Sequence, residues 1–201
     1  MKKTLIVCFI ALLFTMTLYG CRSTETIETN IVKASGSEVF EGSMKKLEPH
    51  LGLITGCANI EYKGEKQFIA CKYEIWENGN ITESTDVFSS RIDGGFEGDV
   101  SVSLKQLRSI DLELSQDMIM TTAIGDEKGY NSSTSFVKRF SENFGYSPYV
   151  LTDEIIATDD DEISIWGLMA NAGSSYSQED SIEATAKDSD WAMVLKVYFT
   201  E

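Results

Sequence analysis

The sequence predicts a mainly β protein, an antiparallel β-sandwich with one or two short helices. Short runs rich in β-branched and aromatic residues alternate with Gly, Asn, Asp and Ser along most of the chain. Asn78-Gly79 separates two such runs, and this dipeptide is the strongest short-range signal of a β-hairpin. Both prolines, Pro49 and Pro148, lie between runs, where they cost no ladder hydrogen bond. Strands at this density, with turns between them, are typical of a sandwich.

The clearest predicted strand covers residues 68–76, and the Asn-Gly turn joins it to a second strand at 81–88. Residues 99–104 alternate with period two, so Val100, Val102 and Leu104 are expected to share one face. Glycines at 94–98 are interpreted as a turn or bulge before that strand. The remaining predicted strands cover residues 118–124, 135–140, 149–157, 163–171 and 191–199.

Two short helices are expected outside these strands. Residues 177–186 predict one helix, with Ser177 as its N-cap and Asp180 at the third helical position. Residues 42–47 predict the other. Tryptophans 76, 166 and 191 each lie within a predicted strand, and we expect them in the core.

The first 21 residues have the three-part organisation of an export signal. Lys2 and Lys3 precede an uncharged apolar run at 5–18, which is too short for a membrane-spanning helix. The sequence Leu18-Tyr19-Gly20-Cys21 that ends it resembles the lipobox of bacterial lipoprotein precursors. That resemblance implies cleavage before Cys21 and a diacylglycerol on its sulfur, with the protein at the extracytoplasmic face of the cell membrane. An ordinary secretory signal followed by a cysteine is the alternative.

This reading divides the chain into a signal peptide at 1–20, a lipid-anchored tether at 21–46 and a β-sandwich ectodomain at 47–201. The tether is expected from its polar composition, although the apolar residues near 31–32 and 39–40 would also suit a first strand. In general layout alone, the body resembles the small uncharacterised lipoproteins of Gram-positive bacteria.

The composition is strongly acidic. Removal of Lys2 and Lys3 with the signal peptide changes the net charge from −15 to −17. This balance argues against nucleic acid as a partner and against a domain lying flat on anionic lipid. Solubility outside the cell explains the acidity, and calcium or a basic partner is the alternative.

Two cysteines remain beyond position 21. Cys57 and Cys71 lie equally far from Gly64, within a predicted turn at 63–66. A hairpin turning there would place them on neighbouring strands, so a Cys57–Cys71 disulfide is predicted. Two reduced, buried cysteines are the alternative.

One candidate site is present in the sequence, an acidic cluster at Asp153, Glu154 and residues 159–162. Such charge runs are usually solvated turns, which is the favoured interpretation and needs no cofactor. The alternative is a calcium site with Asp159, Asp161 and Glu162 as possible ligands, because oxygen ligands in one loop suit this ion. The single histidine, His50, cannot build a zinc site by itself, and no serine-nucleophile motif is present.

Two functions are therefore considered. The first is a non-enzymatic domain that binds an unknown protein or envelope ligand while the Cys21 lipid holds it at the membrane. The second is an envelope hydrolase that acts on cell-wall polysaccharide through acidic residues. Two opposed carboxylates in a cleft, one with a raised pKa, would favour the hydrolase.

Overall fold

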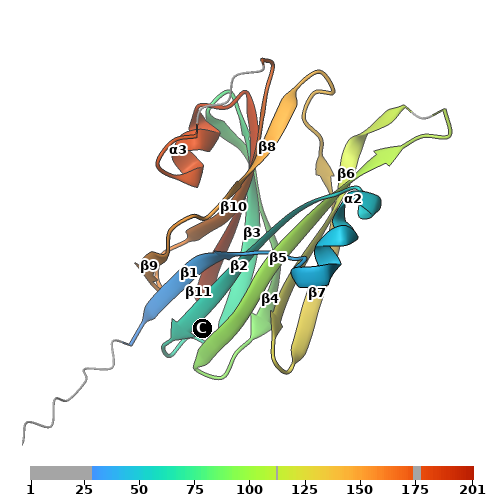
Figure 1. Ribbon diagram of the computed structural model, residues 1–201. Helices are drawn as coiled ribbons and strands as arrows, with labels where there is room; N and C mark the ends of the chain where they lie inside the picture. The colour runs from blue at the N-terminus through green and yellow to red at the C-terminus, as the bar shows by residue number, and fades with distance from the viewer. Residues whose placement is uncertain (1–28, 112, 174–177) are drawn as a thin grey trace, which may run out of the picture.

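The computed structural model describes residues 29–111, 113–173 and 178–201 and confirms the predicted β-sandwich (Figure 1). Two antiparallel sheets pack face to face, and every recorded strand pairing is antiparallel. Sheet A has the order β7 (Gly129–Lys138), β6 (Leu114–Asp126), β5 (Gly95–Arg108), β2 (Leu53–Lys63), β1 (Ile31–Ser37) and β9 (Ile155–Thr158). Sheet B has the order β4 (Asn80–Arg91), β3 (Phe68–Glu77), β11 (Trp191–Thr200), β10 (Ile163–Asn171) and β8 (Gly145–Val150).

Local sequence signals predicted several elements well. Asn78 and Gly79 both have positive φ, at 50° and 75°, and they join β3 to β4 as the predicted tight turn. Strand β10 has the predicted bounds, and β11 runs one residue further than predicted. Of the 94–98 segment, Gly94 has φ of 73° in the turn, whereas residues 95–98 already belong to β5.

The predicted tether at 21–46 is wrong from Ile31 onward. Strand β1 pairs with β2 on one side and with β9 on the other, so it is an interior strand of sheet A. Its side chains at Val32 and Ala34 are fully buried. The folded domain therefore begins at Ile31, because a strand between two neighbours is part of the sheet.

The predicted strand at 149–157 is wrong because this segment belongs to both sheets. Its first two residues end β8 in sheet B, and residues 155–157 lie in β9 of sheet A. Residues 151–154 cross between the sheets. Apolar residues flank the polar crossover closely on both sides, which explains why the sequence resembled one strand.

The core fills the space between the two sheets. Trp166 and Trp191 are buried there, as predicted. The Trp166 indole lies directly against Gly56 of β2, where a Cβ atom would approach Cδ1 to 2.1 Å. Any larger residue at position 56 would force this ring out of its place. Trp76 is different, since it is only partly buried and packs in a second cluster outside sheet B.

That second cluster lies beneath helix α3 (Ile182–Lys187). Ile182 and Ala186 of the helix pack with Met169 and Val194 of sheet B. The helix is capped by Ser181, whose hydroxyl accepts a hydrogen bond from the Ala184 N–H, and not by the predicted Ser177, which lies outside the described residues.

The predicted Cys57–Cys71 disulfide is wrong for this fold, because β2 and β3 do not pair and belong to opposite sheets. Cys71 is fully buried in the core. Cys57 alternates with the core residues Ala58 and Gly56, so it lies on the outer face of sheet A near Ser37. Packed sheets lie about 10 Å apart, whereas a disulfide needs Cα atoms within about 7 Å. Both thiols are free, and burial raises the pKa of Cys57 to about 11 and that of Cys71 to about 12.

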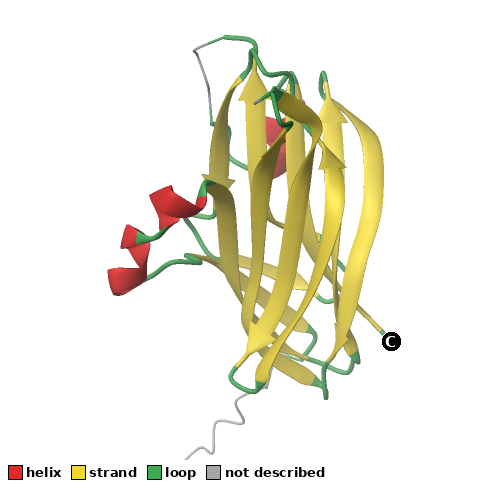
Figure 2. Cartoon of the chain, turned by 90° about the vertical axis from the view of Figure 1, so that its right-hand side faces the viewer, coloured by secondary structure: helices red, strands yellow, loops and turns green. Residues whose placement is uncertain are grey.

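The connection between β1 and β2 contains the 3-10 helix η1 (Gly42–Lys46) and the short helix α2 (Glu48–Leu51). We call residues 42–51 the helical projection, because these helices stand off from the strands at one side of the sandwich (Figure 2). The first of them lies where the sequence predicted a helix at 42–47. All ten residues belong to the described part of the chain, and none of them is buried.

Candidate functional site

The predicted acidic cluster contributes to a pocket of about 320 Å³ that we call the acidic pocket. It lies between the β8–β9 crossover, the start of β10 and the N-terminal end of α3. Its lining includes the six carboxylates Asp153, Glu154, Asp161, Glu162, Asp180 and Glu183. None of the described residues that line it is a lysine or an arginine.

Four of these carboxylates belong to the cluster found in the sequence, whereas Asp180 and Glu183 were not predicted as site residues. They reach the pocket because α3 packs on the outer face of sheet B beside β10. The wall between the carboxylates is apolar and includes Leu151, Ile155 and Ile163. The pocket thus combines an apolar wall with a rim of negative charge.

The carboxylates at Asp159, Asp161 and Glu162 do not form the calcium site that the sequence left open as an alternative to a solvated turn. Asp159 is buried and accepts a hydrogen bond of 2.8 Å from the Tyr62 hydroxyl. Glu162 forms an ion pair of 2.7 Å with Lys72. Within the described residues, no group of three or more His, Cys, Asp or Glu side chains is placed to hold a metal ion.

Asp161 stabilises the turn between β9 and β10. One of its carboxylate oxygens accepts hydrogen bonds from both the backbone N–H and the hydroxyl of Thr158, at 3.0 and 2.8 Å. These bonds hold the pKa of Asp161 below its ordinary value. A lowered pKa suits a hydrogen-bond acceptor in a turn and is the opposite of what a general acid needs.

The acidic pocket borders a charged network on the outer face of sheet B. Glu74 is 4% exposed and lies 3.2 Å from Lys196 and 3.9 Å from Lys72. Lys196 also approaches Glu183, which accepts a hydrogen bond from the Ser164 hydroxyl. Two lysines of sheet B therefore form ion pairs with pocket carboxylates, Lys72 with Glu162 and Lys196 with Glu183.

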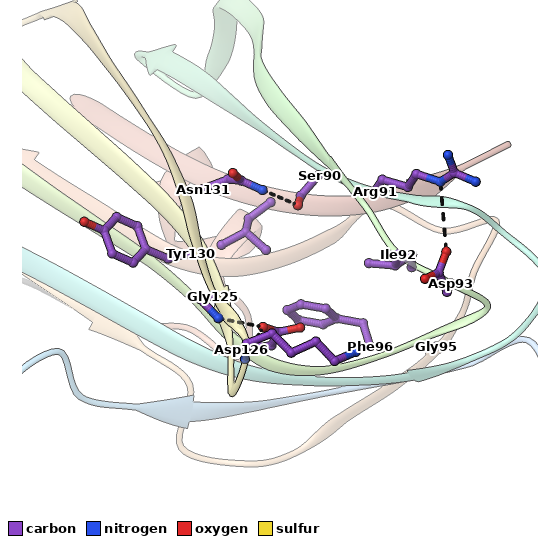
Figure 3. A pocket seen from close by; sticks show the side chains of 13 residues that line it. Ser90, Arg91, Ile92, Asp93, Gly95, Phe96, Gly125, Asp126, Tyr130 and Asn131 are labelled. Atoms are coloured by element: carbon purple, nitrogen blue, oxygen red, sulfur yellow. Dashed lines mark hydrogen bonds and ion pairs between the residues drawn. The ribbon is translucent and has the colours of Figure 1, made fainter.

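A second pocket of about 390 Å³ opens at the edge of the sandwich, between the β4–β5 connection and the β6–β7 hairpin (Figure 3). We call it the edge pocket. Phe96 and Ile124 give it a buried apolar floor, and Tyr130, which is 78% exposed, stands beside it. Asn131 of β7 donates a hydrogen bond of 2.8 Å to the Ser90 hydroxyl of β4, which links the edges of the two sheets. Sequence reasoning did not identify this site, because its residues come from two distant stretches of the chain, 90–96 and 124–131.

Other predicted features lie elsewhere. His50 is exposed in α2 and lines neither pocket. None of the described helices is long and apolar enough to span a membrane. No family model, curated protein or solved structure matches the chain.

Proposed function

We propose that this chain is a lipid-anchored cell-envelope protein whose β-sandwich is a non-enzymatic binding domain. The observation that carries the proposal is the N-terminal pattern: two lysines, an uncharged apolar run and the sequence Leu18-Tyr19-Gly20-Cys21. Nine residues separate Cys21 from the first strand, which is a short leash between the lipid and the folded domain.

Two acyl chains would support a stable anchor, because one chain gives only marginal and reversible membrane binding. Replacement of Cys21 by Ala tests this directly. The wild-type chain is expected to incorporate radiolabelled fatty acid and to fractionate with membranes. Cys21→Ala is expected to lose the label, whereas Cys8→Ala, within the apolar run, is expected to keep it. Equal labelling of wild type and Cys21→Ala would refute the anchor.

The acidic pocket and the edge pocket supply two separate surfaces on which the binding proposal can be tested. Lys72 and Lys196 already pair with Glu162 and Glu183 of the acidic pocket, so a ligand held there would need positive charge to complement the remaining carboxylates. The edge pocket has mixed charge around an apolar floor, with Arg91, Asp93 and Asp126 among its lining residues.

A pull-down from envelope extracts tests the binding domain. The lipid-modified chain is the bait, and Asp153→Asn/Glu154→Gln and Tyr130→Ala/Asn131→Ala are the matched pocket variants. All four positions are exposed at the surface, so these variants are expected to fold. A ligand retained by wild type and lost by one variant assigns the binding pocket. Envelope polysaccharide that is cleaved on incubation with the chain would favour the hydrolase instead.

A further inference from the structure

The helical projection exposes more apolar surface than a short connection between strands requires. Met44, Leu47 and Leu51 are 52%, 46% and 44% exposed, and Val39 just before the segment is 40% exposed. Residues three apart in a 3-10 helix and four apart in an α-helix lie above one another. Leu47 joins η1 to α2 with helical backbone, at φ −84° and ψ −28°, so Met44, Leu47 and Leu51 are expected to share one side of the projection, which we call the apolar ridge.

Two lysines lie next to this ridge, among the carboxylates of Glu38, Glu41 and Glu48. Lys45 and Lys46 are adjacent in η1, in a domain that is otherwise strongly acidic. Lys45 forms an ion pair of 2.5 Å with Glu38, while Lys46 has no ion-pair partner among the described residues. Glu48 is oriented toward the sandwich, because its carboxylate accepts a hydrogen bond of 3.4 Å from Thr55 of β2. Apolar side chains flanked by lysines are typical of segments that lie in a membrane interface.

The leash length allows the projection to reach the membrane that holds the lipid. An extended chain spans at most about 3.5 Å per residue, so the ten steps from Cys21 to Ile31 reach about 35 Å. Strand β1, which leads from the leash to the projection, has seven residues and is about 20 Å long. The leash is thus longer than the strand that separates its end from the projection.

We propose that the helical projection is a second membrane contact. Met44, Leu47 and Leu51 enter the headgroup boundary of the bilayer, and Lys46, which Glu38 does not neutralise, meets the lipid phosphates. This inference rests on the proposed lipid anchor, which keeps the projection at high local concentration beside the bilayer, so a weak contact is sufficient. Only the projection touches the lipid, which leaves the acidic faces of the sandwich away from anionic headgroups.

Depth-dependent fluorescence tests the contact with the lipid-modified chain in vesicles of phosphatidylcholine and phosphatidylglycerol. An environment-sensitive fluorophore is attached at Ser43→Cys, which leaves the apolar ridge intact. The matched control is Glu127→Cys in the β6–β7 turn, an exposed position on another part of the surface. Cys57 and Cys71 are buried, and lipid occupies the Cys21 sulfur, so the label enters the introduced cysteine.

At position 43 we expect a blue-shifted emission and several-fold stronger quenching by brominated lipid than at position 127. In the background of Met44→Ser/Leu47→Ser/Leu51→Ser, the label at 43 is expected to behave like the label at 127. The substituted side chains are exposed, so this variant is expected to unfold at the same urea concentration as wild type.

The outcomes separate this inference from the anchor beneath it. A chain that does not float with vesicles refutes the lipid anchor itself. A chain that floats while labels 43 and 127 respond alike refutes the membrane contact and leaves the anchor intact. If the blue shift at position 43 disappears when each vesicle carries only one protein molecule, a second copy of the chain, and not lipid, covers the ridge. That result also overturns the proposal.

Discussion

Helix α3 and the helical projection both carry apolar side chains at helical spacing, yet only α3 buries them. Ile182 and Ala186 of α3 are 3% and 0% exposed, whereas Leu47 of the projection is 46% exposed. The surfaces beneath them explain the difference. Sheet B offers α3 the apolar side chains of Met169 and Val194, whereas the outer face of sheet A beside β2 carries polar residues such as Thr55 and Ser103. A helical pattern therefore defines an apolar face, but the neighbouring sheet decides whether that face is covered.

The largest expected difference between α3 and the helical projection is in the free energy of unfolding lost when an apolar side chain is truncated. Ile182→Ala is expected to lower the free energy of unfolding by about 2–5 kcal/mol, because it removes a buried side chain and leaves a cavity. The matched substitution Leu47→Ala is expected to change it by less than about 0.5 kcal/mol. Urea unfolding measures both. Equal losses would mean that the projection packs as α3 does.

The charged network beside α3 is the next test. Glu74→Gln is expected to cost about 1–3 kcal/mol, since it leaves Lys196, which is 12% exposed, without its nearest carboxylate. Glu77→Gln removes the carboxylate of the more exposed Lys138 pair and is expected to cost less than about 1 kcal/mol. The comparison uses unfolding at low and high salt, where only a solvent-exposed pair should weaken. A larger loss for Glu77→Gln would contradict the burial argument.

Capping provides a smaller contrast. Ser181→Ala is expected to cost about 1 kcal/mol, because the hydroxyl caps α3 through the Ala184 N–H. Glu41 occupies the corresponding position before η1 and makes no side-chain cap, so Glu41→Ala is expected to have little effect. Thermal unfolding of both variants measures the contrast. Two variants with the same midpoint would argue that the cap on α3 contributes nothing.

An effect of similar size, but dependent on pH, is expected from Tyr198, on the sheet that carries α3. Its hydroxyl donates a hydrogen bond of 2.9 Å to Asp86, and burial together with that bond raises the pKa of Tyr198 to about 12, from 10.0. A raised pKa in the folded state means that this stabilisation is complete below pH 10 and is lost as the pH rises toward 12. Tyr198→Phe is expected to cost about 1 kcal/mol near neutral pH, and its difference from wild type should shrink above pH 10. A difference that stays constant with pH would exclude this linkage.

Local signals predicted the elements whose partners are close in sequence. Asn78-Gly79 specified the β3–β4 hairpin, because positive φ at both residues is a local requirement. The candidate site was only partly predictable. Asp153, Glu154, Asp161 and Glu162 are close in sequence, but Asp180 and Glu183 join them through the packing of α3. The turn at 63–66 was also expected, yet it connects opposite sheets and so separates Cys57 from Cys71.

The sequence by itself determined the sandwich class, the strongest hairpin and the acidic balance, and it carries the N-terminal pattern on which the proposed lipid anchor rests. These properties depend on composition, on alternation along a strand and on short-range turn geometry. Only the tertiary structure decided that 149–157 divides between two sheets, that β1 is an interior strand, and that the apolar ridge at Met44, Leu47 and Leu51 is left uncovered. The physical reason is that sheet partners and packing surfaces are chosen between residues far apart in the chain, and no local pattern encodes that choice.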